Sequence, residues 1–93
     1  MLEWPFEDPE NVTSLTVRPI LEGHQPILLV YHDADDGMWQ FLTGGEFQME
    51  DGMLVSLRTM YRHDLSIGEL ADLPLGWSAS RTAVGQPWRR SPT

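Results

Sequence analysis

An acidic turn followed by an aromatic strand constrains the fold more than any other stretch of this sequence. Residues 33–37 are Asp-Ala-Asp-Asp-Gly, and residues 38–43 after them are rich in β-forming side chains. The run just before the turn, residues 27–31, is the most apolar in the chain. Two β-rich runs joined by Asp-Asp-Gly predict a β-hairpin.

The hairpin also predicts its own register. With Asp33 opposite Met38, His32 faces Trp39, and side chains then alternate between the two faces of the sheet. One face carries four apolar side chains, which we expect to form part of the core. They are Leu28, Val30, Trp39 and Phe41.

Alternation and turn residues predict the remaining elements. We expect strands at 12–18, 27–32, 38–43 and 53–60, and a short final strand near 77–81. One short helix is expected at about 66–73, with Ser66 and Glu69 forming a capping box and Pro74 ending it. Gly68 weakens this helix by roughly 0.8–1 kcal/mol relative to Ala.

These elements predict an α+β fold with a small antiparallel sheet of four to five strands and one short helix in the C-terminal half. Residues 1–11 form an acidic N-terminal arm, which either frays or is held to the body by Trp4 and Phe6. Residues 12–81 form the single α+β domain, and residues 82–93 form a C-terminal tail.

Charge narrows the class of partner. The formal net charge is −8, and residues 1–51 carry eleven acids and one Arg, a net of −10. This balance disfavours nucleic acid and anionic membranes as partners. It predicts either simple solubility or an acidic face that meets a basic protein.

Composition points to the cytoplasm. The chain has no Cys, so it has neither disulfides nor thiolate metal sites. No apolar run approaches the ~20 residues of a membrane span. We therefore expect a cytoplasmic protein.

No pattern for catalysis or for a cofactor is present. The loop beginning at Asp33 fails as an EF-hand because Met38 occupies its sixth position and Gly44 its twelfth. A looser cation site formed by Asp35, Asp36 and Glu46 remains open. We predict no catalytic residue and no cofactor.

Aromatic residues complete the set of candidate binding residues. We expect Trp39 and Trp77 to be buried or half-buried, whereas Trp4 and Trp88 either pack on the body or form an exposed contact patch. The candidate partner-binding residues are Asp33, Asp35, Asp36, Trp39, Glu46 and Trp88.

Three stretches together resemble a known family. They are Asp36-Gly37-Met38-Trp39-Gln40-Phe41 with Gly44-Gly45-Glu46, then Val55-Ser56-Leu57 leading to His63-Asp64, and then residues 70–81. Over residues 12–81 the chain resembles a small bacterial domain-of-unknown-function family with an Asp-Gly-Trp-x-Phe … Gly-x-Glu signature. Some relatives of that family are immunity proteins of polymorphic toxin systems. Here Met38 is inserted before Trp39, and His63-Asp64-Leu65 replaces a common Asp-Pro pair.

The resemblance implies a non-enzymatic cytoplasmic module that binds another protein, without catalytic residues to carry over. Two other hypotheses stay open. One is a small metal-dependent hydrolase that uses Asp35, Asp36, Glu46 and His32. The other is a self-associating structural module, in which Pro19 and Pro26 guard an edge of the sheet.

Overall fold

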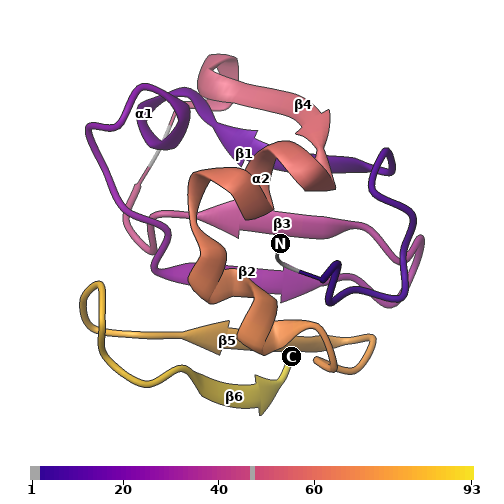
Figure 1. Cartoon of the computed structure of the whole chain (residues 1–93). Helices are drawn as coiled ribbons and strands as arrows, with labels where there is room; N and C mark the ends of the chain where they lie inside the picture. The colour runs from indigo at the N-terminus through magenta and orange to yellow at the C-terminus, as the bar shows by residue number, and fades with distance from the viewer. Residues whose placement is uncertain (1–2, 47) are drawn as a thin grey trace.

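A mixed sheet of six strands carries the fold (Figure 1). The computed structural model describes residues 3–46 and 48–93. The strands are β1 (Thr13–Val17), β2 (Leu29–His32), β3 (Trp39–Leu42), β4 (Gly52–Ser56), β5 (Trp77–Ser80) and β6 (Arg89–Pro92). The helical segments are α1 (Arg18–Leu21), α2 (Leu57–His63) and the 3-10 turns η1 (Met49–Asp51) and η2 (Leu65–Leu70).

The α+β class is as predicted, but the sheet is larger than expected. Its order is β4-β1-β3-β2-β5-β6, so it has six strands rather than four or five. It is mixed because β1 runs parallel to β3. None of the helices in residues 3–46 and 48–93 is long and apolar enough to cross a membrane.

The predicted hairpin is confirmed in type and in register. Val30 pairs with Phe41 and His32 with Trp39. The Asp33 amide closes the turn by donating to the Met38 carbonyl at 2.9 Å. Val30, Trp39 and Phe41 are buried, whereas Leu28 is only partly buried.

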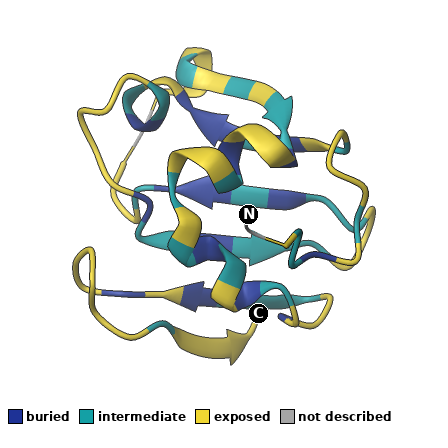
Figure 2. Ribbon diagram, in the orientation of Figure 1, coloured by how far each residue is buried: buried dark blue, intermediate teal, exposed yellow. Residues whose placement is uncertain are grey.

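One face of the sheet is covered by α2, η2 and the N-terminal arm (Figures 1 and 2). The arm is held in place: Phe6 is buried and packs edge-on against Trp39, with ring centroids 5.3 Å apart. Trp4 meets Tyr61 of α2 edge-on at 5.6 Å. The aromatic residues of the arm therefore close one side of the core.

The strand predicted at 53–60 is wrong beyond Ser56. The Ser56 hydroxyl accepts the Thr59 amide at 3.2 Å, which caps a helix instead of continuing the strand. Leu57 and Met60 of α2, three residues apart, are both fully buried. Alternation alone hid this helix, because Met53, Val55 and Leu57 also fit a strand.

The helix predicted at 66–73 is also corrected. The segment is the 3-10 turn η2, and Asp64 caps it by accepting the Ser66 amide at 2.9 Å. Ser66 does not cap it; its hydroxyl donates to Asp64 at 2.6 Å. The predicted apolar side of this segment is nevertheless buried at Ile67 and Leu70.

Residues 82–93 are not a simple tail, because they contain β6. This strand pairs with β5 through Ala79 opposite Arg90. Trp88, just before β6, lies over the guanidinium of Arg81 at 4.2 Å. The segment predicted to be a C-terminal tail therefore completes one edge of the sheet.

Arg81 is a buried cation with several polar partners. Its side chain is only 1% exposed and donates to Asp64 Oδ2 at 2.7 Å. It also donates to the Ser66 hydroxyl at 2.9 Å and to the Ile27 carbonyl at 3.0 Å. One buried cation thus joins the end of β5, the start of η2 and the residues before β2.

The environment of Gly68 predicts that Gly68→Ala destabilises the protein, although helix propensity alone favours Ala. A Cβ at this position would lie 2.8 Å from Tyr61 Cε1 and 3.2 Å from Pro5 Cγ. We expect the free energy of unfolding to fall by about 1–3 kcal/mol, because the ring and the arm must shift. Urea denaturation followed by Trp fluorescence measures this. Gly45→Ala is the control, since its nearest atom would be 3.8 Å away; a stabilised Gly68→Ala variant would contradict the packing.

The Arg81–Asp64 pair predicts a loss of stability in acid. Burial alone would raise the pKa of Asp64, but hydrogen bonds from Ser66 and Arg81 outweigh it and lower this pKa. A lowered folded-state pKa contributes stability above the unfolded-state pKa of about 3.9, and this contribution is lost as pH falls through the folded value. We expect Asp64→Asn to cost about 3 kcal/mol at pH 7, because it leaves Arg81 buried without its anion.

The same variant is expected to flatten the dependence of stability on pH below about pH 4. Denaturation curves at several pH values measure this slope. Asp72→Asn removes the exposed partner of Arg90 and serves as the control, with a much smaller loss at pH 7. Equal losses for the two variants would contradict the role given to the buried pair.

Candidate functional site

Five carboxylates gather at one end of the sheet, which we call the acidic end. They are Glu7, Asp8, Asp33, Asp35 and Asp36. Two segments far apart in sequence supply them: the N-terminal arm and the β2–β3 turn. Both lie at the right-hand end of the sheet in Figure 1.

His32 and Trp39 hold these two segments together. Their rings stack with centroids 3.8 Å apart. The Trp39 indole N–H donates to Asp8 Oδ1 at 3.3 Å. His32 Nδ1 lies 2.7 Å from the Leu73 carbonyl, and because a carbonyl only accepts, Nδ1 carries the proton.

Two shallow hollows flank His32. One, of about 410 Å³, is lined by Glu7 and Asp8 of the arm and by residues 71–75. The other, of about 270 Å³, is lined by residues 33–36 together with Trp77. The acidic end is thus a corrugated surface whose two hollows both border His32.

The carboxylates of the acidic end fall into two groups. Asp33 accepts the Gln40 side-chain amide at 2.7 Å, and Asp36 accepts the Met38 backbone amide at 2.9 Å. Asp8 is engaged by Trp39, as described above. Asp35 and Glu7 are exposed, and within residues 3–46 and 48–93 neither accepts a side-chain or capping hydrogen bond.

No basic group neutralises this surface among the residues that the structure describes. The ion pairs within the described part of the chain are Arg18–Asp51, His24–Glu22, Arg81–Asp64 and Arg90–Asp72. None includes a carboxylate of the acidic end. Like charges held close together produce a negative potential that attracts cations and basic surfaces.

The other three candidate residues do not join this surface. Glu46 lies beyond the opposite end of β3. At about 3.3 Å per residue, the length of this strand alone separates Glu46 from the β2–β3 turn by roughly 10 Å. Trp39 is 1% exposed and belongs to the core. Trp88 is half-buried on Arg81, and its indole N–H has no acceptor among the described residues.

Glu7 and Asp8 were missed as site residues because the arm could not be placed from sequence. The usable signal was the spacing of Trp4 and Phe6, which anchors the arm beside the hairpin. Once the arm is anchored, the two acids after Phe6 must lie near β3. The tertiary contact with Trp39 then decides where Asp8 points.

The fold separates the residues that the hydrolase hypothesis requires. Asp35 and Asp36 lie at one end of β3 and Glu46 beyond the other, while the His32 ring lies on the core face against Trp39. The described residues contain no group of three or more His, Asp or Glu arranged to hold a metal ion. The geometry therefore gives no support to the cation site drawn from Asp35, Asp36 and Glu46.

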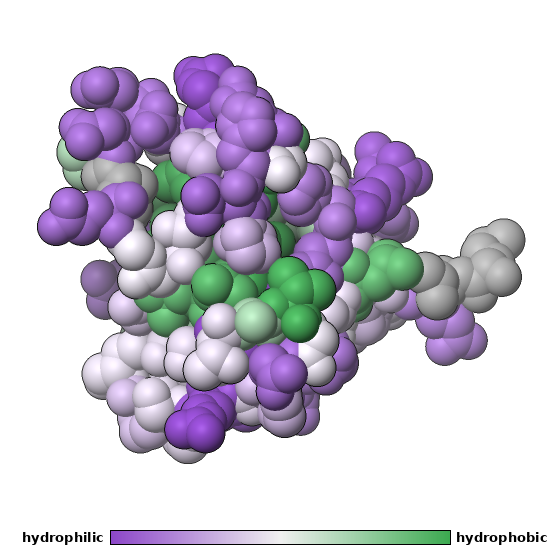
Figure 3. Space-filling model, turned by 90° about the vertical axis from the view of Figure 1, so that its left-hand side faces the viewer, coloured by the Kyte–Doolittle hydropathy of each residue, from purple (hydrophilic) through white to green (hydrophobic). Residues whose placement is uncertain are grey.

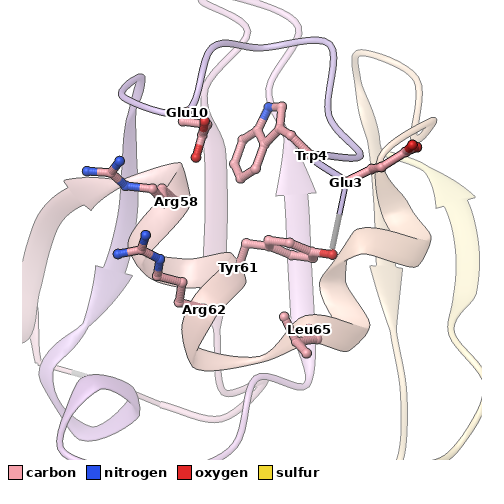
Figure 4. A pocket seen from close by; sticks show the side chains of 7 residues that line it. All are labelled: Glu3, Trp4, Glu10, Arg58, Tyr61, Arg62 and Leu65. Carbon is pink, nitrogen blue, oxygen red and sulfur yellow. The ribbon is translucent and has the colours of Figure 1, made fainter. Parts of the chain in front are cut away.

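Another hollow, of about 760 Å³, lies elsewhere and is lined by side chains of a different kind (Figure 4). Its lining consists of Glu3, Trp4, Glu10, Arg58, Tyr61, Arg62 and Leu65. Arg58 and Arg62 are one turn apart on α2, and Figure 4 shows them extending to the same side, away from the aromatic rings. Neither forms an ion pair within the described residues.

Sequence reasoning missed this Arg pair because residues 53–60 were expected to be a strand. The spacing of four residues was the available signal, since positions i and i+4 share one face of a helix.

The far end of the sheet also differs from the acidic end. Figure 3, which views that end, shows a band of hydrophobic surface between hydrophilic groups.

Comparison with protein-family models, with curated proteins and with solved structures found no match to this chain.

The two groups of carboxylates predict different costs of truncation. Asp36→Ala removes the side-chain acceptor of the Met38 amide, and we expect a loss of about 1 kcal/mol in the free energy of unfolding. Asp35→Ala is expected to stay within about 0.5 kcal/mol of the parent protein. Thermal and urea unfolding measure both. An equal cost for the two variants would contradict the division between structural and unengaged acids.

Proposed function

We propose that this chain is a non-enzymatic protein-binding module whose acidic end engages a basic partner protein. The observation that carries the proposal is the convergence of five carboxylates from two segments, with no basic group paired to them in the described part of the chain. Such a surface accelerates encounter with a positively charged partner and disfavours acidic ones.

Apolar anchors beside the acids support the proposal. Leu75 is 56% exposed, and a Cβ on Gly37 of the turn would lie 4.0 Å from its Cδ2. Trp77 is half-buried and borders the same hollow as residues 33–36. Apolar groups ringed by charge are the usual composition of a binding centre, since burial supplies affinity while the charges steer.

The resemblance to the family that includes immunity proteins supports a specific class of partner. An immunity protein blocks a toxin by occupying it, which requires complementary shape and charge but no catalytic group. A basic toxin domain met in the cytoplasm is therefore the partner that we propose.

A charge-reversal pair tests the proposal. The chain is first used to capture partners from lysate of its own source cells at two salt concentrations, and association with the captured protein is then measured. We expect Asp35→Arg with Glu7→Arg to slow association by about tenfold or more and to flatten its dependence on salt. Both residues are unengaged, so the fold should be retained.

The matched control is Glu22→Arg with Glu46→Arg, which changes the net charge by the same amount at the other end of the sheet. A partner that responds equally to both pairs would show a general effect of net charge and contradict the proposed surface. A partner that ignores both pairs would contradict the electrostatic mechanism.

A further inference from the structure

The two edges of the sheet differ in how they are protected. β6 at one edge carries Arg89, Arg90 and Pro92, and such charges and prolines prevent further strand pairing. β4 at the other edge is Gly-Met-Leu-Val-Ser, with neither a charge nor a proline. Pro19 and Pro26 were expected to guard an edge, but Pro19 lies in α1 after β1 and Pro26 precedes β2, and both strands are interior in the sheet.

The β4 edge also exposes large apolar side chains. Leu54 in the middle of the strand is 66% exposed, and Met49 just before it is 88% exposed. Leu54 lies opposite Leu15 of β1, which lies opposite Gln40 of β3, so these side chains share the face away from α2. An unprotected edge with exposed apolar groups is a template for another strand.

The charges beside β4 favour one orientation of a second strand at this edge. Glu50 and Asp51 precede it, and Arg58 follows it. Glu50 and Arg58 form no ion pair with each other or with any other residue that the structure describes. An antiparallel copy of β4, centred on Leu54, brings η1 of each copy, with Glu50, to the end where α2 of the other copy, with Arg58, begins, whereas a parallel copy brings like charges together.

We propose that two copies of this chain pair through the outer edges of their β4 strands, antiparallel and around a twofold axis at Leu54. The pairing extends the six-stranded sheet into one continuous sheet and brings Leu54 beside Leu54 of the second copy. It forms two symmetric contacts between Glu50 and Arg58. The acidic end is at the β2–β3 turn, so the dimer leaves the proposed partner surface free.

Sedimentation velocity over a concentration series from micromolar to millimolar tests the dimer. The parent protein is expected to show a reversible monomer–dimer equilibrium. Glu50→Arg and Arg58→Glu, made separately, each place two like-charge pairs at the interface. We expect each to raise the dimer Kd by about tenfold at low salt.

Mixing the two variants is the decisive step. In a mixed dimer both contacts again join opposite charges, so an equimolar mixture should associate with nearly the affinity of the parent protein. Leu54→Lys places two cations directly across the axis and should also weaken the dimer. Circular dichroism and thermal unfolding confirm that each variant is folded.

Asp35→Arg and Arg89→Glu are the controls, and neither should change the dimer Kd. A parent protein that stays monomeric throughout the series overturns the proposal. So does a dimer that ignores Glu50→Arg and Arg58→Glu, or a mixture of those variants that fails to associate. Failure of the parent protein to capture a partner, with the dimer intact, would instead contradict only the function proposed for the acidic end.

Discussion

A single buried guanidinium organises the polar interior of this protein. Arg81 reaches the Ile27 carbonyl before β2, together with Asp64 and Ser66 at the start of η2. The ring of Trp88 covers it. A buried charge is tolerated only when it is paired and hydrogen-bonded, so these segments must assemble together around it. The 3-10 turn η2, the β5–β6 hairpin and the end of the helical layer all depend on this arrangement.

A second set of contacts connects the arm to the sheet. Phe6 packs against Trp39, which stacks on His32 and donates to Asp8. These aromatic contacts place the acids of the arm beside the β2–β3 turn. The acidic end is therefore a product of packing, since no single segment contains it. Its negative potential results from two chain segments whose mutual repulsion is overcome by the burial of the rings between them.

The proposed partner surface and the proposed dimer edge occupy separate parts of one sheet. The first lies at the turn after β2, and the second is β4, one of the two edge strands of the sheet. This separation follows from the strand order, in which β1 and β3 stand between β4 and β2. A charged, corrugated end is suited to a partner with complementary charge, whereas an apolar strand edge is suited to backbone pairing. One small domain can thus carry both surfaces without competition between them.

The sequence by itself determined the β2–β3 hairpin, its register and its core face, because a turn of Asp and Gly between two β-rich runs leaves few alternatives. It also determined the α+β class and the excess of acids. Only the tertiary structure decided that β1 pairs in parallel with β3, that Ser56 begins a helix and that Arg89–Pro92 form a strand. The parallel pairing and the final strand depend on contacts between residues far apart in sequence, which local periodicity does not encode. The cap at Ser56 is a local contact with Thr59, but the alternation of residues 53–57 hid it. The candidate site divides in the same way: the turn acids were visible in the sequence, whereas their union with Glu7 and Asp8 required the packing of the arm.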